Sequence, residues 1–327
     1  MLRVGTRKGR RMSVLVVGSV AYDTVRTPAG SREDALGGSA TFFSVSGSYF
    51  TPVSVVAVVG DDFRQADVEL LESHHVDVSG LERRPGKTFR WSGVYGDEGL
   101  NSRETLDTQL NVFADFAPEL SQDQRRQPFL FLGNIAPELQ LDVLGQMETR
   151  PRLVALDTMN FWIEGSRESL RKVVETVDLL FMDEGEARSF AEEPNLVRAA
   201  ERITNMGPSA VVVKRGEHGA LLFKDGTIFL ASAFPLSRVV DSTGAGDSFA
   251  GGFMGYLAAT GDLSVDGFRR AAVVGSVMGS FAVESFSLER LSALAVDEIE
   301  ERFRALTALT DYSPLGEDES LPGRDGL

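Results

Sequence analysis

Short apolar runs recur along the chain and predict the strands of a buried sheet. Amphipathic segments with apolar residues at helical spacing lie between several of these runs. The predicted strands cover 14–18, 54–60, 129–133, 153–157, 178–182 and 210–214, and the predicted helices include 67–71, 137–147, 167–177 and 196–203. Strands that alternate with helices predict an α/β fold with a doubly wound, mainly parallel sheet between two helix layers. Ligands of such folds collect at the carboxyl ends of the strands.

One region breaks this alternation and predicts a β-hairpin. Residues 87–95 alternate with a period of two, 96–99 have the composition of a turn, and 102–113 show no helical stripe. From the residues alone, this hairpin could be a simple addition to the edge of a sheet. Further along, 268–283 predicts a tightly packed helix, and Ser287 is the expected N-cap of the next one.

The composition narrows the classes of partner. The chain has 327 residues, a formal net charge of −15 and no cysteine. The negative charge argues against a nucleic-acid partner, because binding nucleic acid needs clustered Lys and Arg. The absence of cysteine excludes disulfides and thiolate chemistry. No apolar segment reaches the length of about 20 residues that a membrane span needs, so we expect a cytoplasmic protein. Residues 1–11 and 311–327 are polar and are expected to be disordered tails around a domain at 12–310.

The segment 239–253 carries the strongest chemical signal. A β-branched pair leads through Asp241 and Thr243 to the glycine-flanked turn Gly244-Ala245-Gly246 and then to an apolar helical stripe. Glycines at the start of a helix let the backbone approach a ligand, and the free N–H groups there can hold a phosphate. Asp247 would lie in the first turn, where a carboxylate also simply complements the helix dipole. The residues alone leave both roles open.

The string Asp-Ser-Thr-Gly-Ala-Gly-Asp at 241–247 resembles the C-terminal signature of the ribokinase-like (PfkB-type) carbohydrate and nucleoside kinases. This resemblance implies a ribokinase-like fold with a small β-sheet lid, formed by about 22–36 and 87–113, that covers the substrate. It also implies ATP and Mg²⁺ as cofactors. Gly244, Ala245 and Gly246 would form an anion hole, and Asp247 would be the general base.

Other motifs of the same family match on the substrate side. Asp23 follows the first strand, where the family has an Asp that holds sugar hydroxyls, although Ala21 stands where ribose-binding members usually have Asn. A Gly-Gly pair follows, as in the N-terminal signature, which here ends in Thr where the family often has Asn. The implied substrate contacts are Asp23, Gly37, Gly38, Ser39, Thr41, Asn111, Phe113 and Asn134. Taken alone, Asp23, the glycine pair, Asn111 and Asn134 could equally be turn residues.

The nucleotide side also matches in part. Asp183-Glu-Gly-Glu186 resembles the Asn-x-x-Glu element that organises Mg²⁺, with Asp183 in place of Asn; the alternative is an acidic first turn of a helix. The loop after 210–214 would contact ATP through Lys214, Gly216 and Gly219, together with Thr243, Gly244 and Gly246. In some relatives, positions matching Asp241 and Thr243 help bind a monovalent cation, so K⁺ is a further candidate.

These matches favour an ATP-dependent kinase that phosphorylates a primary hydroxyl of a sugar or a sugar-like substrate. A nucleoside kinase, adenosine-like in its acceptor, is the first alternative, because Phe89, Trp91 and Phe113 could stack on a base, although the core of the lid is the simpler place for these aromatics. A non-catalytic sugar sensor on a kinase fold is the second. The edges of a lid sheet could also pair two chains as a homodimer.

Overall fold

The computed structural model describes residues 12–96, 103–316 and 321. Within these residues, nine strands form one large sheet in the order β13-β12-β11-β10-β9-β8-β1-β4-β5. They are β1 (Val14–Val17), β4 (Val53–Gly60), β5 (Val76–Arg84), β8 (Phe129–Leu132), β9 (Leu153–Asp157), β10 (Leu179–Asp183), β11 (Ala210–Lys214), β12 (Ala220–Lys224) and β13 (Thr227–Ala231). Neighbouring strands are parallel except for the pairs β11–β12 and β12–β13. The predicted mainly parallel sheet is confirmed.

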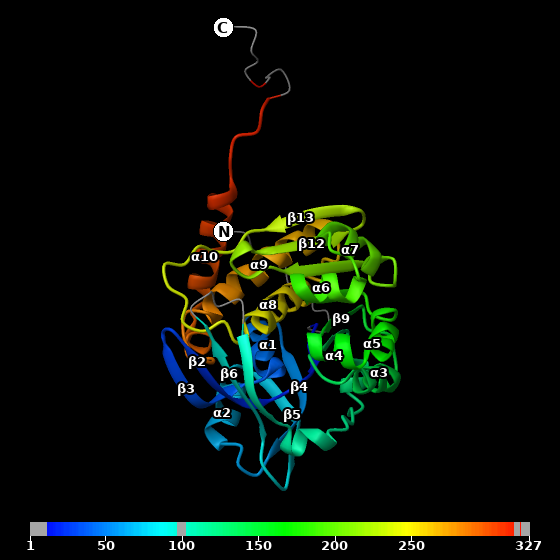
Figure 1. The fold of residues 1–327 in the computed structure, drawn as a ribbon, viewed down its shortest axis with the longest axis vertical. Coiled ribbons are helices and arrows are strands. Elements are labelled where there is room, and N and C mark those ends of the chain that lie inside the picture. The colour runs from blue at the N-terminus through cyan, green and yellow to red at the C-terminus, as the bar shows by residue number, and fades with distance from the viewer. Residues whose placement is uncertain (1–11, 97–102, 317–320, 322–327) are drawn as a thin grey trace.

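Helices cover both faces of the large sheet (Figure 1). One face packs against α1 (Ser39–Ser48), α2 (Gln65–Ser73), α8 (Ala245–Thr260), α9 (Val265–Ala282) and α10 (Val296–Thr310). The other packs against α3 (Pro137–Gln146), α4 (Asn160–Gly165), α5 (Arg167–Val174), α6 (Glu184–Ala191) and α7 (Leu196–Thr204). Short 3₁₀ turns are η1 (Asn111–Asp115), η2 (Gln124–Arg126), η3 (Gly216–His218) and η4 (Leu291–Ala293).

Alternate residues of the central strands enter different cores. In β1, Val14 and Val16 belong to the core under α1 and α8, whereas Leu15 and Val17 belong to the core under the opposite helices. All four side chains are fully buried. A strand covered on both faces needs a continuous apolar run rather than alternation, which explains why the strand runs were visible in the sequence.

A second sheet lies to one side of the large one (Figure 1). We call it the small sheet. It consists of β2 (Ala21–Thr27), β3 (Gly30–Gly37), β6 (Phe89–Tyr95) and β7 (Arg103–Gln109) in the order β3-β2-β6-β7. β2 and β6 are parallel, and the other two pairs are antiparallel. The predicted small sheet is confirmed, and its action as a substrate lid stays a prediction.

Some local expectations differ from the structure. The edge strands β5 and β13 were not predicted. Ser287 is not an N-cap: its φ is 55°, its hydroxyl donates to the carbonyl of Leu36, and α10 begins only after Ala295.

Other predicted segments lie partly beyond the described residues. Most of the predicted hairpin turn and of both tails falls outside them, while 311–316 are exposed and form neither helix nor strand. Within the described ranges, the structure contains no helix that combines the length and the apolar character needed to cross a membrane.

Candidate active site

The candidate site lies where the order of the strands reverses. β1 has β4 on one side and β8 on the other. From β1 the chain first adds β4 and β5 on one side of the sheet, and it later crosses back to add β8 and β9 on the other side. Such a switch point opens a crevice at the carboxyl ends of the strands. α8 packs against both β1 and β8 and brings the 241–247 segment to this crevice.

The start of α8 has the geometry that its glycines predict. Gly244 precedes the helix with a φ of 74°, and a Cβ there would lie 2.3 Å from ring atoms of Phe42, so only glycine fits. The first N–H groups and the helix dipole favour an anion at this end. The N–H of Ala245 donates to the carbonyl of Ser242 (3.2 Å), so one of the predicted anion-hole donors has a partner within the turn.

Asp247 lies in the first turn of α8 in an unusual electrostatic environment. Burial and the nearby carboxylate of Asp157 raise the pKa of Asp247 to about 7, against the opposing effect of Lys214 and Arg103. A carboxyl group with a pKa close to neutrality can both accept and release a proton under physiological conditions. Complementing the helix dipole does not require a raised pKa, since an exposed Asp with an ordinary pKa complements the dipole equally well.

A buried ion pair lies beside Asp247. Lys214 at the end of β11 donates to both oxygens of Asp157 at the end of β9, at 3.1 Å and 2.8 Å. Burial disfavours the charge of Lys214, but the carboxylates of Asp157 and Glu186 outweigh it and raise the pKa of Lys214. Its ammonium group also reaches the helix start, because a Cβ on Gly246 would lie 3.0 Å from Nζ. The cation therefore lies beside the start of α8, and its contact with ATP stays a prediction.

Asp157 was not among the residues singled out from the sequence. It ends a predicted strand just as Asp23 follows one, and that position was the available signal. Arg103 at the start of β7 was also missed; it lowers the pKa of both Asp23 and Asp247, and its guanidinium lies 5.6 Å from the centroid of the Trp91 ring. The residue has no motif around it that could have indicated this position.

Asp23 on β2 is buried against the glycine pair. A Cβ on Gly37 would lie 2.0 Å from Oδ2 of Asp23, so the missing side chain makes room for the carboxylate. Burial and the carboxylate of Asp241 raise the pKa of Asp23 to about 7, and a hydrogen bond from the Gly38 backbone opposes this. Asp23, Phe42, Asp241 and Thr243 line one small pocket. The structure thus brings the substrate motif and the α8 signature together.

Asp183 and Glu186 form a capping box at the start of α6. The N–H of Glu186 donates to Oδ1 of Asp183, and the N–H of Asp183 donates to Oε2 of Glu186, both at 2.7 Å. The alternative raised from the sequence, an acidic first turn of a helix, is therefore confirmed, and the binding of Mg²⁺ stays a prediction. Burial and the charge of Asp183 raise the pKa of Glu186 to about 8. The box uses one oxygen of each carboxylate, and the excess negative charge favours a cation nearby.

The chemistry of this donor set fits Mg²⁺ bound together with a nucleotide. Within the described residues, no group of three His, Cys, Asp or Glu side chains could hold a metal by itself. Mg²⁺ bound through one or two carboxylates, phosphate oxygens and waters needs no such group.

Asp241 and Thr243 form a tight turn before α8. Oδ1 of Asp241 accepts from the N–H of Thr243 (2.9 Å), and the hydroxyl of Thr243 lies 3.0 Å from the hydroxyl of Tyr95 on β6. The small sheet therefore contacts the segment that leads to the helix start. Binding of K⁺ by these two residues stays a prediction.

The remaining predicted contacts are already engaged within the protein. The hydroxyl of Ser39 accepts from the N–H of Ser19 (3.2 Å). Asn111 donates to the carbonyl of Thr88 (3.0 Å), and Oδ1 of Asn134 accepts from Trp162 (2.9 Å).

Two other predicted substrate contacts are packed into the protein. The ring of Phe113 stacks between those of Phe89 and Phe116, at 5.2 Å and 5.5 Å between centroids. Thr41 lies in α1 and is fully buried, and its hydroxyl has no hydrogen-bond partner within the described residues, so its contact with a substrate stays a prediction. Gly216 and Gly219 flank η3 in the β11–β12 connection, and their contact with ATP stays a prediction.

Residues 12–289 match the family model of the pfkB family carbohydrate kinases. The chain belongs to this family. It is 30% identical over 253 residues to the cytidine kinase of Thermococcus kodakarensis, which covers 75% of this chain and 88% of that protein. The fold is ribokinase-like. It matches the nucleoside kinase of Methanocaldococcus jannaschii, an archaeal member of the ribokinase family, with a TM-score of 0.72 and 18% identity over 91% of this chain and 100% of that one.

A second solved structure has the same fold. Aminoimidazole riboside kinase from Salmonella enterica, complexed with aminoimidazole riboside and an ATP analogue, matches with a TM-score of 0.68 and 17% identity. The match covers 89% of this chain and 99% of that one. Membership of the family establishes the chain as a kinase, and therefore as a phosphotransferase.

Proposed function

We propose that the chain transfers the γ-phosphoryl group of ATP to the primary hydroxyl of a nucleoside. The observation that carries the catalytic part is the half-buried carboxylate of Asp247 at the start of α8, with its pKa raised to about 7. Asp247 takes the proton of the hydroxyl as its oxygen bonds to the γ-phosphorus, and the bond from that phosphorus to the leaving oxygen breaks to release ADP. Lys214 and the N–H groups of α8 offset the negative charge of the phosphates.

The small sheet supports a nucleoside as the acceptor. Asp23 pairs in register with Trp91 on the parallel neighbour β6, so both side chains lie on the same face of the small sheet. The carboxylate can hold a sugar hydroxyl while the half-buried indole lies beside it to stack on a base. Of the three aromatic residues that could stack on a base, Phe89 and Phe113 pack against each other as lid core, so we assign the stacking role to Trp91.

The relatives favour the same acceptor class. The similar protein from Thermococcus kodakarensis acts on cytidine, and the matched Salmonella enterica enzyme binds a riboside. We therefore rank a nucleoside above the free sugar that the sequence alone favoured. A free sugar stays the second candidate, because the family model that the chain matches is named for carbohydrate kinases. A non-catalytic sensor would have no need for Asp247.

Two cations belong to the proposal. Glu186 and Asp183 would hold Mg²⁺ beside the phosphates, partly through water, where it would neutralise charge on the transferring group. Asp241 and Thr243 would bind K⁺ next to the helix start. Replacement of K⁺ by a large organic cation should slow turnover, and an unchanged rate would reject the K⁺ site.

A panel of acceptors tests the proposed function. ADP release is measured with ATP, Mg²⁺ and K⁺ in the presence of cytidine, uridine, adenosine, ribose, fructose and inositol, and the product is identified by mass. We expect a nucleoside to give the highest kcat/KM and a nucleoside monophosphate as product. A higher kcat/KM for a free sugar would overturn the acceptor class, and binding without any turnover would favour the sensor.

A further inference from the structure

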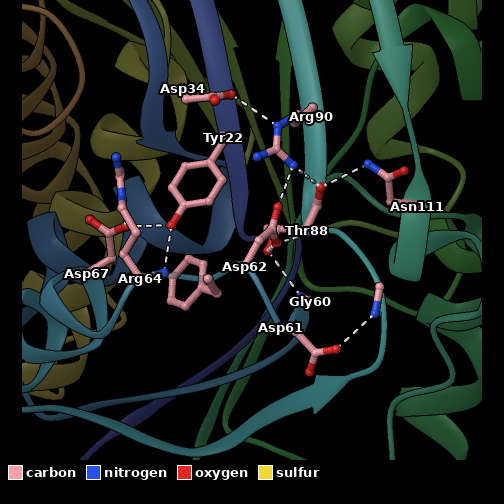
Figure 2. Close-up of polar contacts among 12 residues, drawn as sticks. Tyr22, Asp34, Gly60, Asp61, Asp62, Arg64, Asp67, Thr88, Arg90 and Asn111 are labelled. Atoms are coloured by element: carbon pink, nitrogen blue, oxygen red, sulfur yellow. Dashed lines mark hydrogen bonds and ion pairs between the residues drawn. The ribbon is translucent and has the colours of Figure 1, made fainter.

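A polar network joins the small sheet to the loop that follows β4 (Figure 2). At its centre, Oδ1 of Asp62 accepts from both the N–H and the hydroxyl of Thr88, each at 2.7 Å. Oδ2 of the same carboxylate accepts from the guanidinium of Arg90 at 2.8 Å. A single side chain from the loop after β4 thus holds the chain at the point where it enters β6.

Thr88 is saturated with hydrogen bonds. It is fully buried, and its hydroxyl accepts from the N–H of Gly60 (3.0 Å) as well as donating to Asp62. Its carbonyl accepts from the side chain of Asn111 (3.0 Å), which follows β7. The entry to the hairpin at Thr88 and its exit at Asn111 are therefore tied to each other, and Thr88 connects both to the carboxylate of Asp62, as Figure 2 shows.

Arg90 extends the network across the small sheet. Its Nε donates to Oδ1 of Asp34 on β3 (3.0 Å), so the guanidinium bridges Asp34 and Asp62. The ring of Tyr22 on β2 lies under two guanidinium groups, with Arg64 at 4.4 Å and Arg90 at 5.4 Å from its centroid. Three strands of the small sheet are thereby connected to the loop after β4.

Tyr22 is fixed at its other end as well. Its hydroxyl donates to Asp67 on α2 (2.7 Å) and accepts from the N–H of Arg64 (2.9 Å). Burial raises the pKa of Tyr22 to about 12, so the hydroxyl keeps its proton and remains a donor. β2 is therefore held to α2 one residue before Asp23.

The strand register carries this network to the candidate site. Tyr22 pairs with Arg90, and Asp23 pairs with Trp91, one position further along both strands. Successive side chains of a strand point to opposite faces, so the network lies on one face of β2 and β6 and the acceptor residues lie on the other. A shift of the network side chains would move the backbone that carries Asp23 and Trp91.

We propose that Asp62 is a positioning residue that fixes the base of the small sheet and thereby holds Asp23 and Trp91 against the acceptor. This role rests on the proposed function, in which those two residues bind the acceptor. It assigns Asp62 no contact with either substrate. Loss of the carboxylate should weaken acceptor binding while leaving the nucleotide side, built on β10, β11 and α8, unaffected.

Kinetics of Asp62→Asn test the functional half of the proposal. The amide keeps an oxygen for Thr88 but removes the charge opposite Arg90. With the best acceptor of the panel, we expect KM for the acceptor to rise on the order of 10-fold, the effect of losing one charge-assisted hydrogen bond, and KM for ATP to stay unchanged. An unchanged acceptor KM, or an equal rise in both KM values, would overturn the proposal.

A matched control separates this effect from the general loss of an ion pair. Glu148→Gln breaks the pair that Arg126 of η2 forms with Glu148 (2.7 Å), a bond of nearly the same length in a more exposed place than the Asp62 pair. It should leave both KM values unchanged. Asp34→Asn removes the more exposed partner of Arg90 and should have a smaller effect than Asp62→Asn.

Hydrogen exchange tests the structural half without any acceptor, so the two proposals can fail separately. In Asp62→Asn, amides of 21–27 and 88–95 should exchange on the order of 10-fold faster than in the wild type, whereas those of β8 to β11 should not change. Unchanged exchange in the small sheet, or equal acceleration throughout the chain, would overturn the role of Asp62 even if the kinase assay gives no acceptor.

Discussion

The Lys214–Asp157 pair offers a prediction whose magnitude follows from its burial. Both side chains are largely removed from solvent, with 19% and 6% of their surface exposed. Lys214→Met keeps the length of the side chain but leaves the carboxylate of Asp157 without its cation in a buried, acidic environment. Removing one partner of a buried ion pair typically costs about 3–5 kcal/mol.

Protonation of Asp157 limits this cost. An unpaired buried carboxyl group can take up a proton instead of remaining charged, which from its ordinary pKa of 3.8 costs at most about 4 kcal/mol at pH 7. We therefore expect a loss of about 3–4 kcal/mol in the free energy of unfolding at pH 7. The unpaired Asp157 has a raised pKa in the folded state, so its destabilising effect grows as the pH rises and shrinks as the pH falls towards 4.

Urea denaturation of the wild type and of Lys214→Met between pH 5 and pH 8 measures the difference between their free energies of unfolding. The double variant Lys214→Met, Asp157→Asn is the control, because it leaves no buried charge and should recover at least about half of the loss. A loss below about 1 kcal/mol at pH 7, or a loss that does not shrink at lower pH, would refute the argument that the two charges depend on each other.

Three further predictions concern the candidate site. Asp247 must be ionised to act as a base, so kcat/KM should fall as the pH drops through about 7, and Arg103→Gln should move this fall to higher pH because Arg103 lowers the pKa of Asp247; identical pH profiles would exclude that influence. Gly37→Ala places a methyl group 2.0 Å from the carboxylate of Asp23 and should raise KM for the acceptor but not for ATP, whereas equal KM values for the variant and the wild type would contradict the close approach. Gly244→Ala combines a φ of 74° with a clash against Phe42 and should lower stability by at least about 1 kcal/mol in thermal unfolding, a cost that an unstrained turn would not show.

The sequence predicted the central strands well because they are buried on both faces. Runs such as 129–133 and 210–214 have no polar residue before their last position, and the structure contains strands there. β5 was missed because Val76–Arg84 carries Asp, Ser, Gly, Glu and Arg, as an edge strand can. The expected N-cap at Ser287 failed because the hydroxyl is engaged by Leu36, a contact between residues 251 positions apart.

The sequence predicted the arrangement of the site only where the site residues are close together in the chain. The 241–247 segment contains its own turn, helix start and carboxylate, so its arrangement was predictable. Asp157 and Lys214 are 57 positions apart and meet because β9 and β11 both flank β10. Thr41 matched a motif position, but the packing of α1 against α8 buries it.

The most direct test of the proposed mechanism is the turnover of Asp247→Asn. Asparagine keeps the shape of the side chain and removes one charge from an acidic, buried cluster, so folding and ATP binding should be retained. Loss of a general base typically reduces kcat by about 10²- to 10⁴-fold, and we expect a loss in this range with the best acceptor of the panel. Wild-type turnover by a folded Asp247→Asn protein would contradict the assignment of Asp247 as the base.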